Sequence, residues 1–94
     1  MAALTGPGVL ASGGGAGGTR WALLSFQKVT TADTFDASTL TTIAAFNVVT
    51  AGIFLSTSNR TATATVSTIA SSTIISLLGT GIAADAGILL IIGE

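Results

Sequence analysis

The sequence predicts an all-β fold: a small antiparallel β-barrel or sandwich of about six strands, preceded by an extended glycine-rich N-terminal arm. Short runs rich in Val, Ile, Thr and Phe recur from residue 19 onward, and turn residues separate them. Polar and apolar residues alternate along several of these runs, as they do on a pleated strand with one covered face. β-Branched residues lose rotamer freedom in a helix, so we expect little regular helix.

The N-terminal arm covers residues 1–18, and the β domain covers residues 19–94. The arm holds seven of the twelve glycines and the only proline. A segment so poor in large side chains cannot bury enough area to offset the entropy of ordering itself. Fully extended, it would reach on the order of 60 Å, enough to cross a neighbouring subunit. Its anchors would be the bulkier apolar residues Met1, Leu4, Val9 and Leu10.

The first predicted strand is TRWALLSFQKV, residues 19–29. Its alternation gives it two faces, one with Trp21, Leu23 and Ser25 and the other with Ala22, Leu24 and Phe26. Trp21 fits an interface anchor and a core residue equally well. A second, short strand is expected around Thr34 and Phe35, with Asp33 and Asp36 in turns. Ser38 is a candidate cap for one helical turn.

The third apolar run, residues 43–55, is expected to break near Gly52, where a bulge or bend would redirect the strand. Residues 56–60 form the following loop, and Asn59 is the residue best suited to a positive φ. Residues 61–69 and 73–78 are then predicted to pair as a hairpin. In its first strand the wetter face would carry Thr61, Thr63, Thr65 and Ser67, and the inward face Ala62, Ala64 and Val66.

The closing run ILLII, residues 88–92, is apolar without alternation, which is typical of a strand covered on both faces. The runs 19–29 and 43–55 also carry apolar residues on both sides. A small barrel has only one inside, so the surplus apolar faces need cover from partners. We therefore expect a subunit of a larger assembly.

Composition excludes several functions. Charged residues make up 7% of the chain, against roughly 25% in an average domain. Three scattered cations cannot neutralise a row of phosphates, so nucleic acid is not an expected partner. The chain has no cysteine and no histidine, which removes most metal and nucleophile chemistry. Ser, Thr and Asn interrupt the charge-free runs 37–59 and 61–84, so no membrane span is expected.

The remaining motifs have ordinary explanations. GGGAGG at residues 13–18 matches a dinucleotide-binding pattern, yet no strand is expected before it and no helix after it, so we interpret it as a hinge. Asp33 and Asp36 are the only closely spaced carboxylates, and turn residues are the preferred interpretation over a catalytic pair or a calcium site. Asn59 opens a glycosylation acceptor by coincidence in a Thr-rich chain, and the Thr run 61–67 lacks the repeated rows an ice surface needs. We expect no catalytic residue, metal or cofactor.

Three stretches carry a family resemblance: the glycine-rich start, TRWALLSFQKVTTADTFDASTL and GTGIAADAGILLIIGE. Together they resemble the head decoration, or capsid cement, proteins of tailed phages. The resemblance implies an all-β trimer or similar homo-oligomer on the outer surface of the virion capsid, bound to the major capsid protein and bridging capsomers. The hypothetical capsid contacts are Leu4, Val9, Leu10 and Trp21. Another phage structural subunit, from a tail or fibre, and a small ligand-binding β-barrel remain the alternatives.

Overall fold

The computed structural model describes residues 3–4, 6–14, 16–30, 32–40, 43, 46–57, 63–68, 72–78, 82 and 85–94. Within these residues the chain is all-β, as predicted, with two 3-10 turns, η1 (Ala16–Gly18) and η2 (Ala37–Thr39). The seven strands described there are β1 (Gly8–Gly14), β2 (Arg20–Val29), β3 (Thr34–Asp36), β4 (Val49–Ser56), β5 (Thr63–Thr68), β6 (Ile74–Leu78) and β7 (Asp85–Gly93). None of the described helices is of the length and apolarity that crossing a membrane requires.

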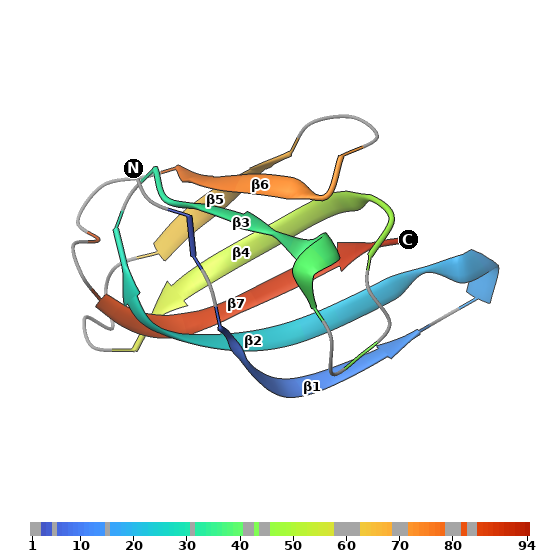
Figure 1. The fold of residues 1–94 in the computed structure, drawn as a ribbon, viewed down its shortest axis with the longest axis horizontal. Helices are drawn as coiled ribbons and strands as arrows, with labels where there is room; N and C mark the ends of the chain where they lie inside the picture. Colours follow the sequence, from blue (N-terminus) through green and yellow to red (C-terminus); the bar gives the residue numbers. More distant parts are fainter. Residues whose placement is uncertain are drawn as a thin grey trace.

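The strands join one antiparallel sheet in the order β1-β2-β7-β4-β5-β6-β3. Among the described residues β1 and β3 are its two edges, so this hydrogen-bonded ladder is open. The sheet curls until β3 and β6 face β2, β7 and β4 as a second layer (Figure 1). The rings of Phe26 and Phe35 meet edge to face across the space between the layers, with centroids 5.4 Å apart. The core therefore lies inside this curl.

Strand β2 confirms the predicted alternation. Ala22, Leu24 and Phe26 are buried in the core, while Trp21 is exposed. Because a strand presents successive side chains to opposite faces, the sequence pattern alone was enough to separate the two sides. The hairpin predicted for residues 61–78 is also confirmed, since β5 pairs antiparallel with β6.

Of the inward face predicted for the Thr-rich strand, Val66 packs against the core. Thr61 and Ala62 lie outside the described residues, as do Asn59 and most of its loop. The side chains of Thr63, Ala64 and Thr65 are likewise outside the description. The prediction of a wetter Thr face stays a prediction.

The break expected near Gly52 is wrong, because β4 runs through this residue without interruption. The irregularity in its pairing with β7 falls earlier, between Val49 and Ala51. A Cβ on Gly52 would lie 2.8 Å from the backbone oxygen of Leu90. The glycine therefore allows β7 to approach closely. Ile43, where the strand was expected to begin, lies in a bend.

Strand β7 lies between β2 and β4 in the sheet. Its inner residues Leu89 and Ile91 are completely buried, whereas Ile92 on the other face is exposed. Within one chain this strand is therefore covered on one face, and cover of its other face by a partner stays a prediction. The curl of one sheet encloses only one side.

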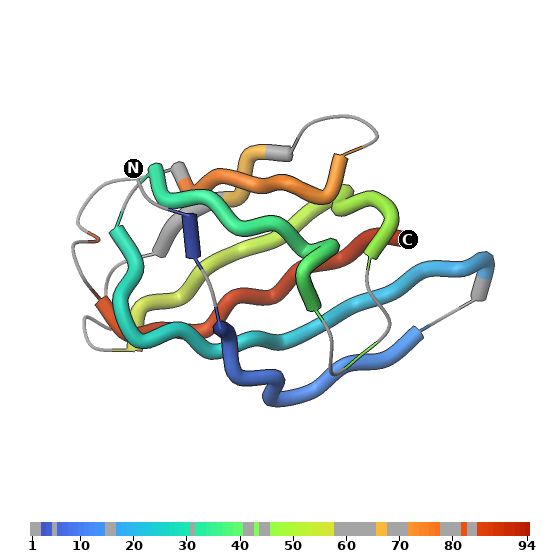
Figure 2. Tube along the Cα trace, in the orientation of Figure 1, coloured from blue at the N-terminus to red at the C-terminus, as the bar shows by residue number. Residues whose placement is uncertain are grey.

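The segment predicted as an arm follows the body of the domain where the structure describes it. Gly8–Gly14 form the edge strand β1, which pairs with β2 and has an irregularity between Val9 and Ala11. Nearer the N-terminus, the Leu4 amide donates to the Thr34 carbonyl at 2.7 Å, and Ala3 forms an isolated parallel bridge with Thr34. In Figure 2 the blue N-terminal trace crosses from β3 to β1. These contacts hold both sheet edges close to the same segment.

Candidate functional site

The outward side of β2, β7 and β4 carries four of the six exposed large hydrophobic residues among those that the structure describes. Cross-strand pairing arranges its side chains in rows: Trp21 lies opposite Ile92, and Leu23 lies opposite Leu90. The rows continue into β4, where Ile53 is the partner of Leu90. We define the outer face as Trp21, Leu23, Ala51, Ile53, Leu55, Ile88, Leu90 and Ile92.

No charged residue belongs to the outer face, and several of its largest side chains are open to solvent. The exposed fractions are 37% for Trp21, 40% for Ile53, 41% for Leu55 and 38% for Ile92. Contiguous exposed apolar patches of this kind mark contacts with proteins or membranes. The face therefore has the chemistry of an interface.

Local sequence explains why this side is apolar. ILLII in β7 supplies large apolar side chains to both faces of the strand. Burying one face in the core therefore leaves the other face outside. In β4, Ile53 and Leu55 flank the fully buried Phe54 and point the opposite way. The alternation of a strand thus converts a continuous apolar run into a core half and a surface half.

Trp21 is supported by a glycine on the neighbouring strand. Gly13 is its cross-strand partner, and a Cβ on Gly13 would lie 2.8 Å from the indole Nε1. The indole therefore covers the space that a side chain on β1 would fill. Gly13 belongs to the GGGAGG motif that we interpreted as a hinge, and the structure places it in a strand.

The four predicted contact residues fall into two groups. Leu4 and Val9 are half-buried and pack against the core. Leu10 is 56% exposed at the β1 irregularity, and Trp21 is exposed on the outer face. The structure thus leaves two of the four, Leu10 and Trp21, open for contact with a partner.

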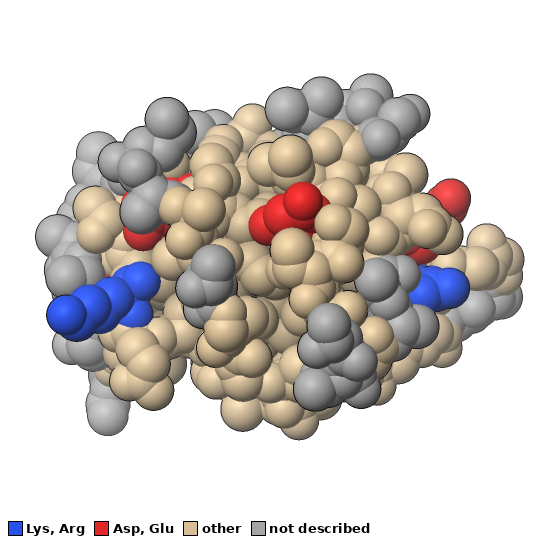
Figure 3. Space-filling model, in the orientation of Figure 1, with Lys and Arg blue, Asp and Glu red and all other residues tan. Residues whose placement is uncertain are grey.

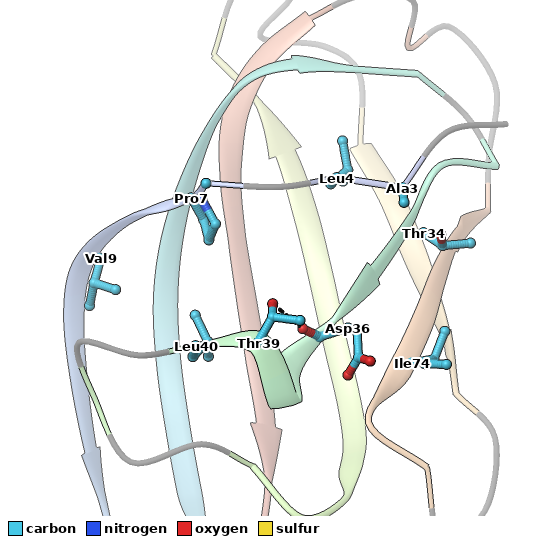
Figure 4. A pocket seen from close by; sticks show the side chains of 10 residues that line it. Ala3, Leu4, Pro7, Val9, Thr34, Asp36, Thr39, Leu40 and Ile74 are labelled. Carbon is cyan, nitrogen blue, oxygen red and sulfur yellow. Dashed lines mark hydrogen bonds between the residues drawn. The ribbon is translucent and has the colours of Figure 1, made fainter.

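A separate hollow of about 440 Å³ lies between the N-terminal segment and the η2 turn (Figure 4). Leu4 and Pro7 line it from the N-terminal segment, and Thr39 and Leu40 line it from η2 and its end. Among the described residues that line it, Asp36 is the charged one. The hollow is mainly apolar. Whether it suits a polar ligand therefore depends on whether the Asp36 carboxylate is available to bind one.

The Asp36 carboxylate holds the fold together locally. Its Oδ1 accepts a hydrogen bond from the Thr73 hydroxyl at 2.7 Å and two from Ser38, from the hydroxyl at 2.7 Å and the amide at 2.9 Å. These bonds, that from Thr73 above all, lower the pKa of Asp36 below its usual 3.8. Asp36 rather than Ser38 is the cap of the η2 turn, so the predicted cap residue was wrong.

The carboxylates of Asp33 and Asp85 are also engaged in the fold. Asp33 is buried, and its Oδ2 accepts a hydrogen bond from the Thr30 amide at 2.9 Å. Buried Ser56 donates to Asp85 Oδ2 at 3.0 Å. The local side-chain hydrogen bonds predicted for Asp33 and Asp36 are present, with Asp36 at the end of β3. The described residues contain no group of three or more His, Cys, Asp and Glu placed to hold a metal ion. On the side of the molecule in Figure 3 the charged atoms form small separate patches.

No protein-family model matches this chain, and neither a curated protein nor a solved structure does. The outer face and the hollow are the two features of the described residues that bear on function.

Sequence reasoning named Trp21 as a contact but missed Ile53, Leu55 and Ile92 as individual residues. The sequence did contain a signal for these residues, because each lies in a run that has apolar residues on both faces of the strand. The pattern could not show which of the two faces enters the core.

Proposed function

We propose that this chain is a structural virion subunit, a capsid decoration or cement protein that stabilises an icosahedral phage head by bridging capsomers on its outer surface. The observation that supports this proposal is the uncharged outer face, with Trp21, Ile53 and Ile92 open to solvent. A domain with such a face gains stability when another protein covers it. The resemblance to phage decoration proteins supplies the class of assembly.

The mechanism is passive. Burial of apolar surface contributes about 25 cal/mol per Å² at each junction, and the many copies on a shell multiply this gain. Several weak contacts made by one oligomer hold it in place through avidity. The proposed partners are the major capsid protein and further copies of the chain, with a trimer favoured by the resemblance. The role requires no catalytic residue or cofactor.

The finer fold that goes with this function is a small antiparallel sandwich or barrel. The contact between Phe26 and Phe35 across the curl supports it. A compact β unit of this kind exposes the outward side of its curved sheet as a platform against which another protein can pack. A tail or fibre subunit would use the same platform.

A small ligand-binding barrel is the second candidate, and the hollow beside Asp36 favours it. Against it, Oδ1 of this carboxylate already accepts hydrogen bonds from Ser38 and Thr73. A ligand would compete with the bonds that fix η2 to the start of β6. We therefore rank this function below assembly.

The test is a cryo-EM map of particles that carry the chain, compared with particles assembled with an Ile92→Lys variant. We expect density on the outside of the head at capsomer junctions, and loss of that density with the variant. Lysine at this exposed position leaves the core intact but places a charge in the outer face. Density confined to the tail would move the assignment to a tail subunit, and particles without the chain would refute a virion role.

A further inference from the structure

The outer face is bordered by two charges of opposite sign. Among the charged side chains that the structure describes, Lys28 and Glu94 are the exposed ones, while Arg20, Asp33, Asp36 and Asp85 are at least half-buried. The exposed pair therefore dominates the electrostatics at the border of an otherwise uncharged surface.

These two residues lie at opposite ends of the β2–β7 pair. Lys28 immediately precedes Val29, which is paired with Asp85 at the start of β7. Glu94 follows Gly93, which is paired with Arg20 at the start of β2. Because β2 and β7 are antiparallel, the length of the outer face separates the positive and the negative residue.

Symmetry connects this arrangement to a partner. When two copies pack through the same face, the contact is isologous and its two-fold axis lies in the plane between them. A two-fold axis parallel to the strands would bring Lys28 of one copy near Lys28 of the other, and Glu94 of one copy near Glu94 of the other. An axis across the strands brings Lys28 of each copy near Glu94 of the other. Only the second arrangement joins opposite charges at both borders.

We infer that the outer face binds a second copy of this chain, face to face, with the strands of the two copies antiparallel and Lys28 of each copy beside Glu94 of the other. This inference rests on the proposal that the chain is an assembly subunit, names the partner of its apolar face, and puts a two-fold dimer in place of the trimer that the resemblance favours. The rows around Leu23, Leu90 and Ile53 form the centre of the contact, where two sheets pack about 10 Å apart as in a β-sandwich. Trp21 lies near the Glu94 end and anchors the rim, since Ile92 is its cross-strand partner.

The experiment measures the dimer dissociation constant of the purified chain by sedimentation and follows the emission of Trp21, the only tryptophan in the sequence. We expect a dimer whose formation shifts this emission to shorter wavelength, because the indole leaves water. Ile53→Lys, which puts a charge in the centre of the face, should leave a folded monomer with unshifted emission. A trimer, or a chain that stays monomeric at hundreds of micromolar, would overturn the inference.

Charge exchange tests the orientation. Lys28→Glu and Glu94→Lys should each weaken the dimer about tenfold, because each turns two attractive borders into repulsive ones. The double variant Lys28→Glu/Glu94→Lys should restore the dissociation constant to within about twofold. Ser12→Glu, an added negative charge at an exposed position of β1, serves as the control and should leave it unchanged. Failure of the double variant to recover would exclude the antiparallel arrangement.

Binding to particles separates the two proposals. A chain that stays monomeric in solution while heads remain decorated would refute the partner and keep the proposed function. Intact dimers with the predicted charge response, on particles that carry no such chain, would keep the partner and refute the capsid role. Circular dichroism of each variant confirms that the β fold is retained.

Discussion

The two faces of β7 carry nearly the same residues in different surroundings. Leu89 and Ile91 are completely buried in the curl of the sheet, while Ile92 is 38% exposed on the other side and Leu90 is half-buried. The chemistry of the side chains therefore does not separate core from surface here. What separates them is that one chain encloses a single interior. The outer face is therefore apolar surface that another chain can still cover.

The largest difference should come from removing one large side chain from each face of β4. Phe54→Ala should lower the free energy of unfolding by about 3–5 kcal/mol, because the ring is completely buried and its loss leaves a cavity. Ile53→Ala, one residue away on the outer face, should cost about 1 kcal/mol or less. Urea unfolding at concentrations that keep the chain monomeric gives both values. Equal losses would remove the distinction between the faces.

Added methyl groups sharpen the comparison in the opposite direction. Gly87→Ala should lower the free energy of unfolding by about 1–3 kcal/mol, because its Cβ would overlap the Phe54 ring and the Leu55 backbone oxygen on the inner side. The three atoms nearest to a Cβ on Gly13 all belong to the Trp21 indole, which can move outward, so we expect a smaller loss from Gly13→Ala. Thermal unfolding of the two variants side by side measures the contrast. A Gly13→Ala variant as unstable as Gly87→Ala would show that the indole is held rigidly.

The hydrogen bonds around Asp36 should contribute less than either core change. Asp36→Ala removes the cap of η2 and the bond from Thr73, and should cost about 1 kcal/mol at neutral pH. Because these bonds favour the charged form, the folded-state pKa lies below the unfolded value near 3.8. The carboxylate's contribution is therefore complete above that value and is lost as the pH falls through the lowered folded-state pKa.

Chemical unfolding of the wild type and Asp36→Asn between pH 7 and pH 2 measures this dependence. The gap between the two should be widest at neutral pH and close towards pH 2. A gap that widened on acidification would contradict the lowered pKa.

The smallest effect on stability is expected on the outer face itself. Leu55→Thr keeps the β-propensity of the strand and should change the free energy of unfolding by no more than about 0.5 kcal/mol. Its binding of a hydrophobic dye such as ANS should fall, because the substitution removes exposed apolar area. Unchanged dye binding would mean that the dye binds another apolar surface. The hollow lined by Leu4 and Leu40 would then be the next region to test.

Several parts of the fold could be predicted from local pattern. The faces of β2 and the β5–β6 hairpin follow from alternation and turn spacing, which depend on neighbouring residues only. Gly52 and Asp36 could not be predicted in the same way. The glycine looked like a strand break but accommodates the Leu90 backbone, and Asp36 caps η2 while also binding Thr73, 37 residues away. Both roles depend on segments distant in the sequence.

By itself the sequence determined that the chain forms strands, that it carries almost no charge and that it has more apolar surface than one small interior can cover. These properties follow from residue type and period. Tertiary structure alone decided which face of β7 and β4 entered the core. It also turned Leu4 and Val9 inward and left Leu10 and Trp21 exposed. The reason is that strand order and the curl of the sheet choose the covered face, and both depend on pairings between residues far apart along the chain.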